Sequence, residues 1–235
     1  MQMAISARPG LNSDIVTFLS HDVLWIVDRQ TGGLIKKILL GFVPASPPTP
    51  VGNRVYIGSY DEYLYAYNWQ RELRDWRYKT NGIITSKPAF LSPFLFFASQ
   101  DSTIYVLRET AGTTHSKYHT VGPVTADLVN TMRTVYAASR DFGVYAIGSA
   151  LQWKFMADDA LTLSPIRIGS RGPDEEDTVY AIDKQGVLYA IDPLYGTERW
   201  RMDHVHRYLF RGKGHDFVLR RNRTLASIDN RTGEN

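Results

Sequence analysis

The chain has 235 residues, which is long for an average domain but ordinary for a single closed all-β domain. Hydrophobic residues make up 43% of it and aromatic residues 12%, so a substantial core can form, and the 14 tyrosines favour β-structure. The net charge of +3 is too small to indicate nucleic-acid binding, and the absence of cysteine excludes disulfides, thiolate nucleophiles and cysteine-ligated metals.

The sequence contains no targeting or membrane-spanning segment. No apolar run approaches the about 20 residues that cross a bilayer, and residues 1–10 lack the charged and apolar regions of a secretory signal. We expect an extracytoplasmic protein, periplasmic or envelope-associated, whose signal is absent from this sequence, because the chain enters its repeat pattern almost at once. A cytoplasmic protein is the alternative.

One seven-residue pattern recurs six times along the chain. The copies end at positions spaced by 40, 40, 40, 44 and 37 residues; they are 22–28, 62–68, 102–108, 142–148, 186–192 and 223–229. In five copies an aromatic residue stands three positions before the end: Trp25, Tyr65, Tyr105, Tyr145 and Tyr189. This periodicity indicates a repeat architecture.

A second apolar run precedes each copy, and a short polar turn joins the two. These runs are 14–20, 54–59, 94–99, 134–139, 178–183 and 215–220. Alternating polarity with β-branched and aromatic enrichment around a turn predicts a β-hairpin. Asp61, Asp101 and Asp141 recur in the turns, where we expect them to accept backbone N–H groups.

Two further segments complete each repeat. A third strand is predicted after the hairpin, at 34–40, 73–79, 115–120, 151–156 and 198–203, and short segments such as 86–90, 124–127 and 164–167 lead into the next hairpin. Four strands in about 40 residues, repeated radially, predict an all-β fold, a β-propeller of four-stranded antiparallel blades with about six blades visible.

Residues 190–200, AIDPLYGTERW, carry an A-x-D motif followed by glycine and tryptophan. This segment resembles the blade motif of the PQQ-like β-propeller family, the quinoprotein-type and BamB-like propellers. Partial copies occur in the other repeats: Asp28, Thr31 and Gly32; Ala66 and Trp76; Gly112; Ala146 and Trp153; Asp229, Thr232 and Gly233. The resemblance spans nearly the whole chain.

The motif residues are predicted to have structural, blade-docking roles. Glycine permits a positive φ in a turn, at Gly32, Gly112, Gly196 and Gly233. Tryptophan buries a large apolar face between blades while its N–H needs one partner, at Trp76, Trp153 and Trp200. Ligand stacking is the alternative for the tryptophans.

The chain is predicted to be a single propeller domain, residues 1–235, and a segment of a longer chain. The tryptophan that should follow Gly233 would fall two positions beyond Asn235, so the last blade should lack its outer strand, and six blades is a minimum. The proline-rich segment 41–50 is expected to be a rigid crossing between blades. The acidic insertion 169–177 is expected to be a solvated loop, with docking or cation binding as the alternative.

The resemblance also implies an enzyme hypothesis, because dehydrogenases of this family use eight blades, PQQ and a Ca²⁺ ion held by Glu, Asn and Asp. This chain shows six hairpins, no cysteine and no assignable Ca²⁺ set. We therefore expect no enzyme activity, no catalytic or metal-binding residues and no cofactor. Five histidines offer a weak metal alternative to a surface role: His115, His119, His204, His206 and His215.

Positive charge concentrates near the end of the chain. Residues 199–231 contain nine basic and three acidic residues, a net charge of +6. Arginine suits carboxylates and phosphates. An anionic-partner surface is a hypothesis for Arg207, Arg211, Arg220, Arg221 and Arg223, and a solvated turn is the alternative.

Together these features favour a non-catalytic interaction scaffold that binds other proteins through its rims or blade edges, in an envelope or extracytoplasmic assembly. A PQQ- and Ca²⁺-dependent dehydrogenase with its site in missing blades is one alternative. A module that binds an anionic ligand or polymer through the C-terminal arginines is another. No nucleic-acid partner is expected, and the sequence does not identify the protein partner.

Overall fold

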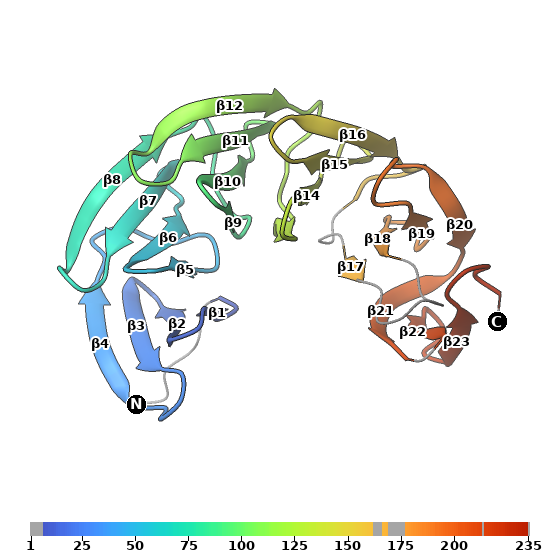
Figure 1. Cartoon of the computed structure of the whole chain (residues 1–235), viewed down its shortest axis with the longest axis horizontal. Coiled ribbons are helices and arrows are strands. Elements are labelled where there is room, and N and C mark those ends of the chain that lie inside the picture. Colours follow the sequence, from blue (N-terminus) through green and yellow to red (C-terminus); the bar gives the residue numbers. More distant parts are fainter. Residues whose placement is uncertain (1–6, 162–165, 169–176, 213, 235) are drawn as a thin grey trace. The chain divides into compact units, whose positions relative to one another are not determined.

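The computed structural model of the chain describes residues 7–161, 166–168, 177–212 and 214–234, and every regular element in them is a β-strand (Figure 1). The chain forms two compact units, Met1–Leu128 and Val129–Asn235. Each unit is built from antiparallel sheets whose strands follow one another in chain order.

The first unit contains three four-stranded sheets. Its strands are β1 (Gly10–Leu11), β2 (Ile15–Ser20), β3 (Val23–Asp28) and β4 (Leu34–Leu39); β5 (Thr49–Val51), β6 (Arg54–Gly58), β7 (Tyr63–Asn68) and β8 (Leu73–Lys79); and β9 (Ala89–Leu91), β10 (Phe94–Ser99), β11 (Thr103–Arg108) and β12 (Thr113–His119).

The second unit contains two four-stranded sheets and one sheet of three strands among the described residues. Its strands are β13 (Val129–Asn130), β14 (Val135–Ala138), β15 (Gly143–Ile147) and β16 (Leu151–Met156); β17 (Ile166–Ile168), β18 (Thr178–Ile182), β19 (Leu188–Ile191) and β20 (Glu198–Met202); and β21 (Val205–Arg211), β22 (His215–Arg220) and β23 (Leu225–Asp229).

These sheets confirm the predicted blades. All six hairpins form, five sheets carry the predicted outer strand, and the sixth has none among the described residues. We number the blades one to six in chain order. The prediction of a single domain over residues 1–235 stays a prediction.

The innermost strands lie later than predicted. Residues 86–90 and 124–127 were expected to form them, but β9 and β13 begin at Ala89 and Val129. Side chains bind the preceding residues instead, since Ser86 Oγ donates to the Ala98 carbonyl at 2.9 Å and Asp127 Oδ1 accepts Lys87 N–H at 2.9 Å. The proline-rich segment 41–50 likewise ends inside β5, an edge strand that tolerates Pro50.

A β-bulge recurs in the outer strand of all five four-stranded blades. In blade two, Ala66 is paired with Trp76 and Tyr67 with Arg74, so Asp75 is the extra residue. The corresponding extra residues in the other blades are Ile35, His115, Gln152 and Arg199. A bulge bends the strand and re-aims one side chain.

Three of the five extra residues form polar contacts at the start of the second strand in the same blade. Asp75 pairs with Arg54 at 2.6 Å, and Gln152 accepts a hydrogen bond from Thr134 Oγ1 at 3.1 Å. Arg199 donates to Thr178 Oγ1 at 3.3 Å. The repeated bulge therefore connects the outer strand of a blade to its inner half.

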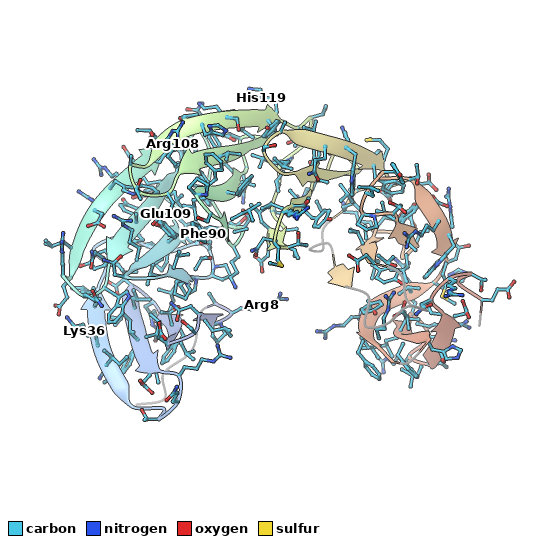
Figure 2. All side chains as sticks on the ribbon, in the orientation of Figure 1. Arg8, Lys36, Phe90, Arg108, Glu109 and His119 are labelled. Carbon is cyan, nitrogen blue, oxygen red and sulfur yellow. The ribbon has the colours of Figure 1, made fainter. Side chains whose placement is uncertain are left out.

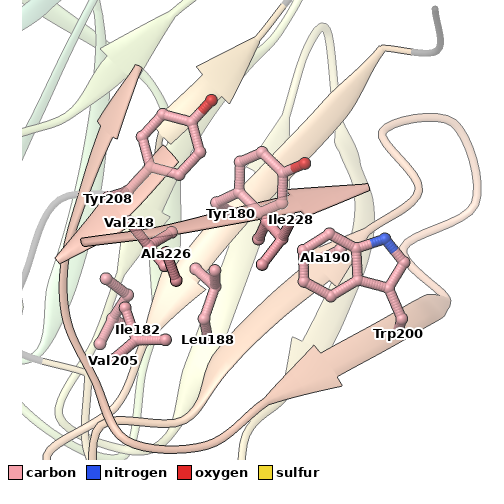
Figure 3. Close-up of a cluster of buried hydrophobic side chains, with 10 residues drawn as sticks. All are labelled: Tyr180, Ile182, Leu188, Ala190, Trp200, Val205, Tyr208, Val218, Ala226 and Ile228. Atoms are coloured by element: carbon pink, nitrogen blue, oxygen red, sulfur yellow. The ribbon is translucent and has the colours of Figure 1, made fainter. Parts of the chain in front are cut away.

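The core lies between neighbouring blades. One cluster joins β2–β4 to β6, a second joins β6 and β7 to β10 and β11, and a third joins blades five and six (Figure 3). In blades two to five both faces of the middle strands are buried, which is why residues such as Tyr56, Phe96 and Tyr180 are fully covered. Burial of one such side chain contributes about 1.5–3 kcal/mol.

Candidate functional site

The three motif tryptophans each cover a glycine of the following blade. A Cβ atom at Gly112 would lie 2.5 Å from Trp76 Cδ2, and the same distance is 2.6 Å for Gly196 and Trp153 and 2.7 Å for Gly233 and Trp200. All three glycines have a positive φ. Only glycine meets both constraints, because it has no Cβ and adopts this backbone without strain.

The indole N–H groups are satisfied at the same contacts. Trp76 Nε1 donates to the Glu109 carbonyl at 3.2 Å (Figure 2 labels Glu109), and Trp153 and Trp200 donate to the carbonyls of Pro193 and Asn230 at 3.0 and 3.2 Å. A tyrosine of the same blade packs on each indole at 5.6–5.8 Å: Tyr56, Tyr136 and Tyr180. Trp153 and Trp200 are only 9% and 7% exposed, which leaves little surface for a ligand.

Blade one uses a different residue for the same contact. Lys36, labelled in Figure 2, stands at the tryptophan position of β4, and its Nζ donates to the Gln70 carbonyl at 3.1 Å and to Glu72 Oε1 at 2.5 Å in blade two. Gly32 has a φ of +71°, but nothing lies within 4 Å of where its Cβ would be. Gly32 is therefore required only by the backbone conformation of its turn, whereas the other three glycines also make room for an indole ring.

The turn aspartates accept backbone N–H groups. Asp61 and Asp141 accept the N–H groups of Tyr63 and Gly143, at 3.2 and 3.0 Å, as expected for turn residues. Asp101 instead accepts the N–H of Asn81, in the crossing segment, at 3.0 Å.

Each of these carboxylates also accepts a tyrosine hydroxyl, which the sequence analysis missed. The donors are four residues further on and lie 2.5–2.6 Å away: Tyr65, Tyr105 and Tyr145. Burial, and then the neighbouring carboxylate, raises the pKa of these hydroxyls above the ordinary value. The recurring spacing of four residues between aspartate and tyrosine could have predicted these hydrogen bonds.

The predicted arginine surface includes one residue that does not belong to it. Arg211 is buried, 4% exposed, and its Nε lies 2.9 Å from Asp216 Oδ1. It also donates to the Tyr180 hydroxyl at 3.0 Å, in the cluster of Figure 3. The correction follows from strand register, since Arg211 on β21 is paired with Asp216 on β22.

The other four arginines lie at the surface. Arg207, Arg221 and Arg223 are exposed and Arg220 is half-buried. Arg220 and Arg221 line a hollow of about 430 Å³ together with Asp203, His204 and Asn222. The basic cluster is thus reduced to the β22–β23 turn and one residue of β21.

The histidines do not assemble a site in the part of the chain that the structure describes. His204 lies in the turn before β21 with a φ of +63°, whereas His206 lies within β21. No three histidine, aspartate or glutamate side chains group to hold a metal ion among the described residues. The acidic segment 169–176 lies outside them.

An apolar hollow of about 400 Å³ lies at the turn edge of blades one and two, the edge that carries the β2–β3 and β6–β7 turns. Its apolar lining residues are Ala7, Leu19, Val43, Pro44, Ala45 and Tyr60, and its polar ones are His21, Asp22 and Ser46. Val43 and Tyr60 are 64% and 57% exposed. No sequence motif marks this surface, because its residues are scattered over a strand and several connecting segments.

The walls of the apolar hollow are held by hydrogen bonds. Tyr60 N–H and Ser59 Oγ both donate to the Val43 carbonyl, at 3.2 and 2.7 Å, and Ser46 Oγ accepts the Gly58 N–H at 2.8 Å. The crossing segment and the β6–β7 turn are therefore fixed to each other. A surface held in this way loses little entropy when it binds.

Among the described residues no helix has the length and hydropathy to span a membrane.

Comparison with known proteins points to one family. Residues 75–208, more than half of the chain, match the family model described as "Outer membrane protein assembly factor BamB". No curated protein matches the chain.

Solved structures share the fold. The crystal structure of BamB from Moraxella catarrhalis superposes with a TM-score of 0.78 and 14% identity, covering 97% of this chain and 72% of that one. The computationally designed Ika8 protein gives 0.74 and 17%, covering 100% and 73%. At these identities the likeness concerns the fold.

Proposed function

This chain belongs to the family of the outer membrane protein assembly factor BamB, and from that membership we propose that it is a non-catalytic propeller that binds another protein in an envelope assembly. The family description names an assembly factor, a role that depends on protein contacts. An extracytoplasmic location, periplasmic or envelope-associated, is part of the same proposal.

The observation that carries the proposal is the apolar hollow. Val43 and Tyr60 expose large apolar surfaces beside a cavity that can receive one or two side chains of a partner. Aromatic and aliphatic anchors in fixed pockets carry most of the binding energy of protein interfaces. The repeated tryptophans and aspartates, by contrast, are engaged within and between blades.

Co-purification of a tagged chain from an envelope fraction tests the proposal. We expect a defined partner protein to be retained by the wild type and lost from Tyr60→Asp, because a carboxylate at the hollow cannot be desolvated there without a partner. Leu73→Asp is the matched control, since Leu73 on β8 is 61% exposed and does not line the hollow. Equal retention by Tyr60→Asp and the wild type would contradict the proposal.

The enzyme alternative needs a separate assay. We expect no dye reduction when the chain is incubated with PQQ, Ca²⁺ and alcohol or sugar substrates. Turnover above that of PQQ alone would overturn the non-catalytic part of the proposal.

A further inference from the structure

The turn of blade six departs from the repeat in a way that reverses its charge. In blades two to four the turn reads Ser-x-Asp, and the serine Oγ accepts the aspartate N–H at 3.2–3.4 Å. Blade six has Arg220 and Asn222 at these two positions, with Arg221 between them. The serine hydroxyl of the repeat is thus replaced by a guanidinium, and the aspartate carboxylate by a neutral amide.

A second exchange in the same blade removes bulk. The tyrosine that donates to the turn aspartate in blades two to four is replaced by Ala226 at the corresponding position of β23. Blade six therefore lacks both the tyrosine ring and the aspartate carboxylate to which the tyrosine hydroxyl donates. We define the hollow of about 430 Å³ formed by Asp203, His204, Arg220, Arg221 and Asn222 as the arginine pocket.

The side chain of Arg221 is held in place in the arginine pocket. Its Nη2 donates to the Lys184 carbonyl at 2.5 Å, and its backbone N–H donates to the His204 carbonyl at 2.8 Å. It also crosses Gly186, where a Cβ would lie 2.6 Å from Arg221 Nε. A guanidinium held in this way is preorganised to bind a ligand.

The other donors lack acceptors. Arg220 Nε is buried and has no hydrogen-bond partner among the described residues. Asn222 Oδ1 accepts the N–H and hydroxyl of Thr224, at 3.0 and 2.6 Å, so its amide nitrogen remains a donor. Asp203 is the one carboxylate of the pocket, and no ion pair joins it to either arginine in the described part of the chain.

We propose that the arginine pocket binds an oxyanion, a carboxylate or phosphate group, in the place where blades two to four hold their own aspartate. Guanidinium groups form short, charge-assisted hydrogen bonds with both anions. The proposal is independent of the proposed function, because none of its residues lines the apolar hollow.

Titration of the intact chain with inorganic phosphate and, separately, with glutarate tests it by ¹⁵N NMR at constant ionic strength. We expect saturable shifts at residues 203–204 and 220–222 with at least one anion, and the two arms distinguish phosphate from carboxylate as the preferred group. Shifts that rise linearly with both anions would overturn the proposal.

Variants separate a site from general positive charge. Arg220→Ala should weaken binding about tenfold or more, because it removes charge-assisted hydrogen bonds. Arg207→Ala removes the same charge from a residue that does not line the pocket and should change affinity less than twofold. Equal losses in the two variants would show that general charge alone attracts the anion, and would overturn the proposal.

Asn222→Asp keeps the test valid if Arg220→Ala fails to fold. Blades two to four carry aspartate at this position and fold, and its Oδ1 can still accept the Thr224 N–H. We expect this variant to melt as the wild type does and to lose anion binding about tenfold, because the new carboxylate repels the anion. Unchanged binding by a folded Asn222→Asp would contradict the proposal.

Discussion

Gly112 and Gly32 occupy the same turn position in two blades and have φ angles of +63° and +71°, but an indole covers only Gly112. Comparison of these two residues therefore separates the cost of the backbone conformation from the value of blade docking. The difference between the stability losses on substituting the two glycines also tests the role of Trp76 in blade docking, with Trp76 itself left in place.

We expect Gly32→Ala to lower the free energy of unfolding by about 1 kcal/mol, the cost of a positive φ for alanine. Gly112→Ala should lower it by about 3 kcal/mol, because its Cβ also displaces Trp76. Urea unfolding followed by tryptophan fluorescence measures both. Equal losses would show that the indole contact contributes nothing.

The ion pair of Arg211 with Asp216 provides a second residue-scale prediction. Asp216→Asn leaves a buried guanidinium without its counter-charge and should cost about 3–5 kcal/mol. Asp203→Asn, at an exposed carboxylate, should change stability by less than about 0.5 kcal/mol. Thermal and urea unfolding of both variants measure this, and a loss below about 1 kcal/mol in Asp216→Asn would refute the buried-pair description.

At this scale the sequence predicts the glycine and tryptophan positions because the motif repeats. It does not predict Arg211, since a basic run suggests a surface when the residues are read one by one. The predicted pairing of the strands could have indicated the buried ion pair, because it places Arg211 opposite Asp216. Lys36 stands at the tryptophan position of blade one, and its contact with blade two follows only from the coordinates.

At the scale of the strands, the bulge in the outer strand is the feature that the alternation of polar and apolar residues does not predict. The predicted strands lie within a few residues of the observed ones, yet one extra residue in each outer strand changes which side chains face the next blade. Asp75 is the extra residue in β8, directly before Trp76.

Deletion of Asp75 should therefore be more harmful than its substitution. The deletion shifts the register, so either Trp76 leaves Gly112 or Leu73 and Arg74 exchange faces, and we expect a loss of several kcal/mol. Asp75→Ala keeps the bulge, removes the half-buried pair with Arg54 and should cost about 1 kcal/mol. Unfolding titrations of both compare the two, and similar losses would show that the bulge has no role.

For the whole molecule, stability should be greatest at neutral pH. Backbone N–H groups lower the pKa of Asp28 and Asp229, and Arg199 lowers that of Asp192 although burial opposes it. A folded pKa below the unfolded value of about 3.9 stabilises the protein above that pH. This contribution is lost as the pH falls through the folded pKa.

The tyrosine–aspartate pairs act in the opposite direction. Burial raises the pKa of Tyr105 and Tyr145 above the unfolded value of about 10, so their contribution is complete below pH 10 and is lost as the pH rises through the folded pKa. Urea midpoints measured from pH 2.5 to 11 should show a plateau that declines at both ends. Rising stability between pH 10 and 11 would contradict this assignment.

The fold of the whole chain was predictable because every blade repeats one pattern, and the repeat carries the information. The function was less predictable than the fold. The repeated residues hold the blades together, so the repeat itself carries no information about a binding site. The apolar hollow and the arginine pocket lie where blades differ, and the cavities themselves follow from packing that single-sequence patterns do not specify.

The most direct test of protein binding is photo-crosslinking at position 60. A photoreactive amino acid replaces Tyr60 at the apolar hollow or, as a control, Leu73 on β8, and the chain is irradiated in living cells. The account predicts one discrete crosslinked product of higher mass from position 60 and none from position 73. No product from position 60, or the same products from both, would contradict the claim that this propeller binds a protein through its apolar hollow.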